Sequence, residues 1–223
     1  MRAGITHRCG SNCSSMIAAL VGLAVLAGTA GFAQGAIVTV VNNSFELPPT
    51  ATFTPSIFGW TGTGDFGVFR PDSHFPAYNG LNPPAGDQVA YSNGGMISQV
   101  LTTLLSSETI YTLKVDVGNR LDLFFPGFEV GLYAGGQLLA SSSSPIPADG
   151  TYVPVVVQYI STPNDPNAGE ALEIRLISNG VQVNFDDVEL DATPTPEPST
   201  LTVIGLGAIG LAVGAWRRRK LAA

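Results

Sequence analysis

The sequence predicts an all-β protein, a β-sandwich of the jelly-roll type, flanked by an N-terminal signal helix and a short C-terminal transmembrane helix. Short segments of the central region alternate apolar and polar residues, Gly-rich turns separate them, and no helical periodicity interrupts them. Alternation with period two marks strands with one buried and one solvated face. Many short strands without helices favour a sandwich. We expect one domain over 37–192, between a signal peptide at 1–36 and a tail at 193–223.

The first 36 residues have the composition of a secretory signal peptide. An apolar run over 16–33 follows Arg2 and Arg8, and small residues permit cleavage after Ala33 or near Ala36. A basic lead, an apolar segment and a small-residue exit are typical of such peptides. An uncleaved anchor helix is the alternative. Both cysteines lie in this leader, so its removal leaves no disulfide and no thiolate metal site.

Seven segments of the central region read as strands because apolar residues share one face or form short runs. Turn signals such as Asn-Gly-Gly, Gly-Gly and Asp-Gly separate several of them. The expected strands are 37–42, 88–93, 96–101, 111–118, 128–133, 152–160 and 172–178.

The closing strand, 181–190, changes its alternation halfway. Its apolar residues stand at odd positions through Phe185 and at even positions from Val188. A one-residue slip would move a whole face into water, so the change predicts a β-bulge at Asp186 and Asp187.

The two ends of the domain resemble those of galactose-binding-like jelly rolls, a fold that includes many carbohydrate-binding modules. The matching segments are NNSFELP (42–48) and FDDVEL (185–190), although the glycine common at the second position of the first motif is missing. The resemblance implies a structural Ca²⁺ that joins the first and last strands through Glu46 and Asp187, with Asp186. Carboxylates are ligands that Ca²⁺ prefers. The alternative is that these acids are solvated charges at strand ends.

The C-terminal tail combines a proline-rich spacer, an apolar span over 201–216 and a basic cluster. As a helix the span is about 24 Å long, short of a hydrocarbon core of about 30 Å. The tail resembles the PEP-CTERM sorting signal. This resemblance implies an exosortase-type processing protease, transient anchoring in the inner membrane, and a host that makes extracellular polysaccharide. An ordinary membrane anchor is the alternative. The matching motif residues are Pro196, Glu197, Pro198, Arg217, Arg218 and Arg219.

The central region is strongly acidic. All 17 acidic residues lie between Glu46 and Glu197, where only four basic residues accompany them. Such a surface repels phosphate backbones, so we expect no nucleic-acid partner.

Catalytic motifs are hard to find. After cleavage of the leader the chain keeps one histidine, His74, next to Asp72 and Ser73. Adjacent residues cannot form a catalytic triad, whose members converge in space. No two carboxylates stand out as a glycosidase pair. The sequence therefore predicts a protein that is not an enzyme.

The long loop 70–88 is the candidate ligand site, because loops of this length are often functional. Its residues Arg70, His74, Tyr78 and Asn79 combine a flat aromatic ring with hydrogen-bonding groups that suit a sugar. The alternative for Tyr78 is that it plugs one end of the sandwich.

Three further aromatic residues are expected to pack. We favour the plugging role for Phe124 and Phe125, and we expect Trp60 in the core.

Together these features predict an exported, non-catalytic protein of the cell surface or extracellular matrix that associates with exopolysaccharide. A purely structural matrix protein is the alternative, and a secreted glycan-active enzyme is the third hypothesis. Exposed loop aromatics favour the first, buried ones the second, and two convergent acids in a cleft the third.

Overall fold

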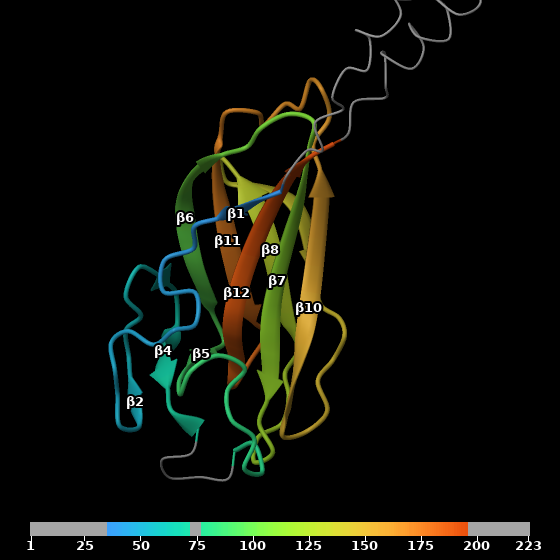
Figure 1. The fold of residues 1–223 in the computed structure, drawn as a ribbon. Coiled ribbons are helices and arrows are strands. Elements are labelled where there is room, and N and C mark those ends of the chain that lie inside the picture. Colours follow the sequence, from blue (N-terminus) through green and yellow to red (C-terminus); the bar gives the residue numbers. More distant parts are fainter. Residues whose placement is uncertain (1–34, 72–76, 196–223) are drawn as a thin grey trace, which may run out of the picture. The chain divides into compact units, whose positions relative to one another are not determined.

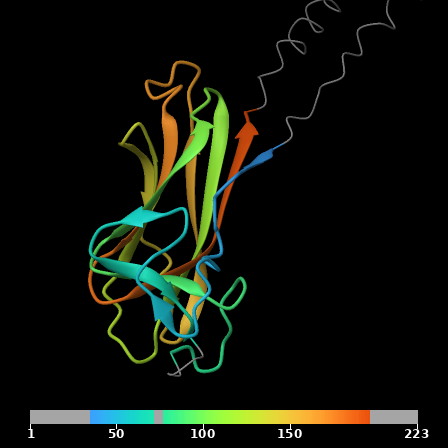
Figure 2. The same ribbon diagram turned by 90° about the vertical axis from the view of Figure 1, so that its left-hand side faces the viewer.

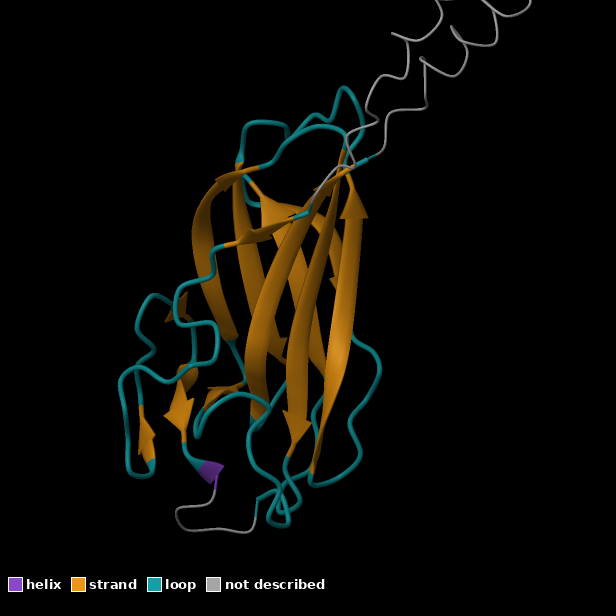
Figure 3. Ribbon diagram, in the orientation of Figure 1, coloured by secondary structure: helices purple, strands orange, loops and turns teal. Residues whose placement is uncertain are grey.

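Two antiparallel sheets face each other in a β-sandwich (Figure 1). The computed structural model describes residues 35–71 and 77–195. Strands and loops make up nearly all of this part, with one short helical turn (Figure 3). The predicted all-β sandwich is therefore confirmed.

The larger sheet has the order β10-β7-β12-β5-β4-β2, with β1 paired to β12. Its strands are β1 (Ala36–Val38), β2 (Phe53–Thr54), β4 (Asp65–Phe69), β5 (Val89–Asn93), β7 (Thr109–Asn119), β10 (Thr151–Ile160) and β12 (Val183–Pro194).

The smaller sheet has the order β3-β6-β11-β8-β9. Its strands are β3 (Thr61–Gly62), β6 (Met96–Leu104), β8 (Phe128–Ala134), β9 (Gln137–Ser142) and β11 (Ala171–Ser178).

The core lies between the sheets and follows the predicted alternation. Leu113, Val115 and Val117 of β7 and Ile174 and Leu176 of β11 are fully buried in one cluster. Burial of such side chains is the main favourable term in folding. The alternation that predicted these strands is thus the alternation that builds the core.

The aromatic predictions have mixed outcomes. Trp60 is buried beside Phe45 and donates its indole N–H to the Val41 carbonyl at 3.0 Å, as expected of a core residue. Phe125 packs against the core, but Phe124 is 90% exposed, so its predicted plugging role is wrong. Two adjacent residues at a loop tip point in different directions, and only one reaches the sandwich.

The predicted bulge in the closing strand is confirmed. The pairing of β12 with β7 shifts between Asp186 and Glu189, and Asp187 has a φ of 47°. The bulge keeps both Phe185 and Val188 buried in the core. It also turns the two adjacent aspartates in different directions.

The described chain enters and leaves the sandwich at the same end. Ala36 of β1 pairs with Ala192 of β12, and both views show the two ends side by side (Figures 1 and 2). β12 continues through Pro194, and the Thr195 amide donates to the Glu108 carbonyl at 2.7 Å. The first residues of the expected tail are therefore part of the sheet.

The predicted signal helix, the transmembrane span and the sorting residues Pro196, Glu197, Pro198, Arg217, Arg218 and Arg219 lie outside the described residues. Within 35–71 and 77–195, no helix has the length and hydropathy needed to cross a membrane.

Candidate functional site

A cleft of about 280 Å³ opens on the outer face of the larger sheet. Its size is close to the lower end for small-molecule sites. The cleft is lined by Phe53, Asp65, Phe69, Tyr91, Asn93, Arg120 and Gln182.

Strand alternation brings the centre of the cleft together. Asp65 and Phe69 of β4 share one face, while the intervening Val68 is buried in the core. β5 pairs antiparallel to β4, with Asn93 opposite Asp65 and Tyr91 opposite Gly67. Side chains directly opposite each other on one face lie close together. An acid, an amide and two aromatic rings therefore converge on one patch.

Gly67 permits the close approach of β2. A Cβ at this position would collide with the carbonyl oxygen of Thr54. With glycine there, β2 pairs with β4 and places Phe53 opposite Phe69. Phe53 is 62% exposed and forms a wall of the cleft.

One end of the cleft presents hydrogen-bond acceptors. Asp65 accepts a hydrogen bond from the Tyr91 hydroxyl at 3.3 Å and one from the Asn93 amide nitrogen at 2.7 Å. Burial, then the charge of Asp65, raise the pKa of Tyr91 to about 12, so its phenol stays a donor. Asn93 Oδ1 is buried and has no hydrogen-bond partner within the described part of the chain.

The other end presents a fixed guanidinium group. Arg120, which follows β7, lies over the Phe69 ring with its Cζ 5.0 Å from the centroid. Its Nε and Nη2 donate to the two oxygens of Asp122 at 2.9 and 2.7 Å, and its Nη1 donates to Gln182 Oε1 at 2.7 Å. Arg120 is only 8% exposed although it lines the cleft.

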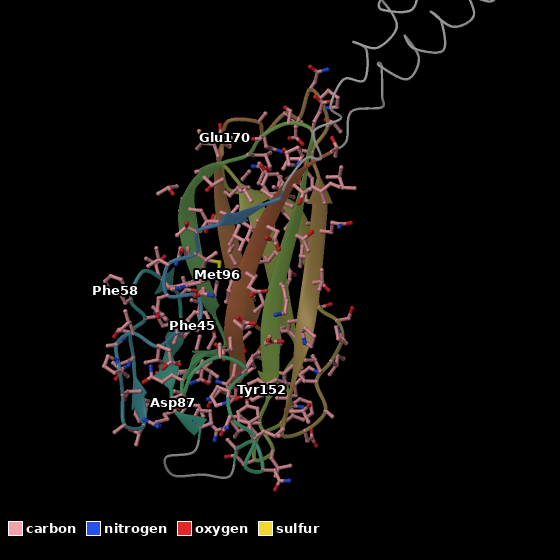
Figure 4. The ribbon with its side chains drawn as sticks, in the orientation of Figure 1. Phe45, Phe58, Asp87, Met96, Tyr152 and Glu170 are labelled. Carbon is pink, nitrogen blue, oxygen red and sulfur yellow. The ribbon has the colours of Figure 1, made fainter. Side chains whose placement is uncertain are left out.

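Beside the cleft, the same sheet face carries a closed aromatic cluster, which we call the Tyr78 cluster: Phe69, Ala77, Tyr78, Val89, Tyr91 and Tyr152. The ring of Tyr152, which is labelled in Figure 4, stacks on that of Tyr78 at 4.1 Å between centroids. The Tyr78 hydroxyl donates to Asn184 at 2.7 Å. Gly118 makes room for the Tyr152 ring and the Tyr78 hydroxyl, since a Cβ there would collide with both.

The predicted sugar site is not assembled as expected. Tyr78 is 1% exposed, so its ring belongs to a core and offers no platform to a ligand. Arg70 forms an exposed ion pair with Asp87 at 3.1 Å, and Asn79 is exposed in a turn with a φ of 51°. His74 lies outside the described residues.

Two of the three predicted calcium ligands point toward one segment. Asp186 Oδ2 accepts the Ala85 amide at 2.9 Å, and Glu46 Oε1 accepts the amides of Asp87 and Gln88 at 2.9 and 2.8 Å. Both carboxylates fit a hard cation in chemical type.

Asp187 does not join them. The bulge directs it to Lys114, whose Nζ lies 2.9 Å from Asp187 Oδ2. Among the described residues, no group of three or more His, Cys, Asp or Glu residues is placed to hold a metal ion. The calcium site therefore stays a prediction, with Asp187 outside it.

Among the predicted calcium ligands, Asp186 has a strongly raised pKa. The pKa of Asp186 is raised to about 8, mainly by burial. Hydrogen bonds from the amides of Ala85 and Asp187 lower this pKa, and the charges of Asp187 and Glu46 raise it. A buried carboxyl beside a second carboxylate favours its neutral form unless a cation is near.

The cleft residues were not predicted from the sequence. They come from segments far apart in the chain, and the strands β2, β4 and the turn before β12 are too short for a periodic signal. The available signal was the pair of patterns Asp65-x-Gly67-x-Phe69 and Tyr91-x-Asn93, whose neighbouring residues Val68 and Ala90 face the core between the sheets.

Comparison with known families identifies two regions. A family model described as HpiC1 cyclase matches residues 36–191, and the PEP-CTERM protein-sorting motif matches residues 194–220. The second match confirms the PEP-CTERM resemblance and supports export, cell-surface targeting and exosortase-type processing. No curated protein matches the chain.

Solved structures of cyclases from Fischerella share the fold. A Stig cyclase, Fisc, from Fischerella sp. TAU in complex with (3Z)-3-(1-methyl-2-pyrrolidinylidene)-3H-indole is 29% identical, with a TM-score of 0.66 over 73% of this chain and 100% of that one. A cyclase from the same source in complex with 4-(1H-indol-3-yl)butan-2-one is 30% identical, with a TM-score of 0.66 over 72% and 98% of the two chains.

Carbohydrate-binding sandwiches are also among the structural neighbours. The CBM22-1 xylan-binding domain of Paenibacillus barcinonensis Xyn10C is 17% identical, with a TM-score of 0.46 over 72% of this chain and 97% of that one. At this distance the likeness says nothing about a ligand.

The prediction that the protein is not an enzyme is contradicted by the cyclase family match and by the cyclase structures. That prediction rested on missing triads, thiols and histidine clusters. A cyclase that works by positioning its substrate and stabilising charge needs none of them.

Proposed function

Because the chain belongs to the HpiC1-like cyclase family, we propose that its exported sandwich is a cyclase-type enzyme that binds a small aromatic, nitrogen-containing molecule in the cleft. The observation that carries the proposal is a cleft that holds the Asp65 carboxylate and is lined by the rings of Tyr91, Phe69 and Phe53. Related cyclases bind indole compounds, which supports this class of ligand.

The cleft suits a flat ring with a proton-bearing nitrogen. Aromatic walls bind planar molecules, and a ligand cation gains additional attraction over ring faces. Asp65 makes no ion pair with a described residue, so its charge is available to a ligand N–H or cation.

Asp65 is also the group that could assist ring formation. In an acid–base cyclisation the substrate gains a proton, one of its own electron pairs forms the new bond, and a proton is returned. The product is an isomer of the substrate, so no oxidant or reductant is consumed. Asp65 would hold or accept that proton and stabilise positive charge in the transition state.

Exopolysaccharide is the second candidate ligand, and it would use the same cleft. The cleft combines aromatic rings with an acid, two amides and an arginine, and these groups also bind sugars. Under this hypothesis the sorted protein is held briefly at the inner membrane and then stays with the extracellular matrix.

Calorimetry on the full chain separates the candidates. We expect tryptamine to bind more tightly than indole by about fivefold, because the ammonium group pairs with Asp65 in a partly exposed site. Asp65→Asn should remove this preference for tryptamine. Asp191→Asn is the control and should keep the preference, because Asp191 is an exposed acid that does not line the cleft. Binding of the host's polysaccharide without binding of either indole would overturn the cyclase proposal.

A further inference from the structure

We propose that Arg120 selects ligands that carry a carbonyl or carboxylate oxygen, which it binds at the end of the cleft opposite Asp65. This inference rests on the proposed function, because it names a second recognition group in the same cleft. It narrows the ligand from any aromatic nitrogen compound to one with an acceptor oxygen on the side remote from its nitrogen.

The guanidinium group of Arg120 has hydrogen-bond donors that the described residues do not use. A guanidinium group has five N–H donors. Three of them are used within the described part of the chain, two by Asp122 and one by Gln182. One N–H on each terminal nitrogen therefore remains for another acceptor.

The guanidinium group of Arg120 is held firmly in place. Arg120 is 8% exposed, with the Phe69 ring on one face of its guanidinium and Asp122 along one edge. An arginine fixed in this way loses little conformational freedom when a ligand binds, so its donors are preorganised.

The backbone next to it supports the same conclusion. Gln182 has a φ of 47°, a left-handed conformation that a non-glycine residue adopts at a cost. That conformation places the Gln182 side chain against Arg120, where its oxygen accepts a hydrogen bond. Strained residues of this kind gather at ligand sites, where the surrounding structure maintains them.

The two ends of the cleft, one with Asp65 and the other with Arg120, are well separated. Asp65 and Phe69 are four residues apart on β4, which is about 13 Å along a strand. Arg120 lies over Phe69, whereas Asn93 and Asp65 form the other end. Tyr91, opposite the midpoint of β4, lies between them. The cleft thus presents acceptors at one end, an aromatic ring in the middle and donors at the other end.

The charge of Arg120 determines which oxygens fit. Asp122 already neutralises much of that charge and has its own pKa lowered by the hydrogen bond from Arg120. A neutral carbonyl oxygen therefore suits the two remaining donors, and a carboxylate does as well through its stronger charge-assisted bonds. Both share the acceptor oxygen that the proposal requires.

The test compares three indole probes with the same chain length on the full protein: 3-butylindole, an indolyl butanone and indole-3-butyrate. We expect the two oxygen-bearing probes to bind about tenfold more tightly than 3-butylindole, as a hydrogen bond to a charged group allows. The ratio between ketone and carboxylate shows which oxygen is preferred. Equal binding of all three would overturn this proposal, whereas no binding of any probe would overturn the proposed function instead.

Two variants make the assignment to Arg120. Arg120→Lys keeps the charge but loses the planar fork, so it should abolish the tenfold preference for the oxygen-bearing probes. Arg175→Lys is the matched control, because Arg175 also covers an aromatic ring, that of Tyr133, and pairs with an acid, but on the smaller sheet. A preference that survives Arg120→Lys in a folded protein would contradict the proposal. If that variant does not fold, the comparison of probes on the unsubstituted protein still tests whether the cleft prefers ligands with an acceptor oxygen.

Discussion

Two regions on the outer face of the larger sheet are built from similar residues but differ in what fills them. In the Tyr78 cluster, Tyr78 occupies the space over Gly118, and its hydroxyl donates a hydrogen bond to Asn184. In the neighbouring cleft, no described residue fills the space between Phe53 and Arg120. The closed region stabilises the fold, and the open region is left to bind.

The two regions are not independent. Phe69 and Tyr91 belong to both, since each is counted in the Tyr78 cluster and also lines the cleft. Packing from the closed side therefore holds the cleft rings in place. This arrangement gives the open site rigid walls, which a binding site needs for precise geometry.

Replacing one aromatic residue in each region gives the largest expected contrast. Tyr78→Ala removes a buried ring and leaves Asn184 Oδ1 without its donor, so the free energy of unfolding should fall by about 3–5 kcal/mol. Phe53→Ala removes an exposed wall of the cleft and should change it by about 0.5 kcal/mol or less. Urea denaturation of the full chain measures both. Similar losses for the two variants would mean that the regions do not differ as described.

Calcium should stabilise the fold without entering the cleft, because Glu46 and Asp186 are not among the cleft-lining residues. We propose that Glu46 and Asp186 hold Ca²⁺ where both approach the segment 85–88. Calcium at about 100 times its dissociation constant would stabilise the fold by about 2.7 kcal/mol. Melting curves with millimolar calcium and with chelator measure the effect, which Asp186→Asn should abolish. Asp187→Asn is the matched control, because Asp187 pairs with Lys114. Identical melting curves in both conditions would exclude the site.

The smallest expected effect concerns the ion pair at the open side. The hydrogen bond from Arg120 lowers the pKa of Asp122 in the folded protein. The folded state then binds fewer protons than the unfolded state, so the pair stabilises the fold above pH about 4 and loses that contribution as pH falls through the folded pKa. Because Asp122 is partly exposed, the contribution is about 1 kcal/mol at most. The loss of stability from pH 6 to pH 3 should be smaller in Asp122→Asn; an equal loss would contradict this role.

Much of the fold could be predicted from local patterns. The alternation in β7 and β11 and the parity change at Asp186 concern residues adjacent in sequence, and each decides which side chains face the core. The short strands β2 and β3 could not be predicted in the same way. Two residues have no period, and these strands form only because β4 and β6 offer them backbone partners.

The candidate site was less accessible to prediction than the fold. The loop from Arg70 to Gln88 was chosen for its length and its aromatic content, but its tyrosine packs inward. Whether an aromatic ring in a loop faces solvent depends on the space available beneath it. For Tyr78 that space exists because residue 118, forty positions away, is glycine.

By itself the sequence determined the all-β class, the bulge in the last strand and the sorting address, because each depends on the order of neighbouring residues. Only the tertiary structure decided that Tyr78 is core, that Asp186 and Asp187 point to different partners, and that Asp65, Tyr91 and Arg120 line one cleft. The physical reason is that burial and hydrogen bonding depend on which strands pair across the sheet. That pairing joins residues more than a hundred positions apart, as where Ala36 of β1 lies opposite Ala192 of β12. Side chains from loops add similar links, such as the hydrogen bond from Tyr78 to Asn184.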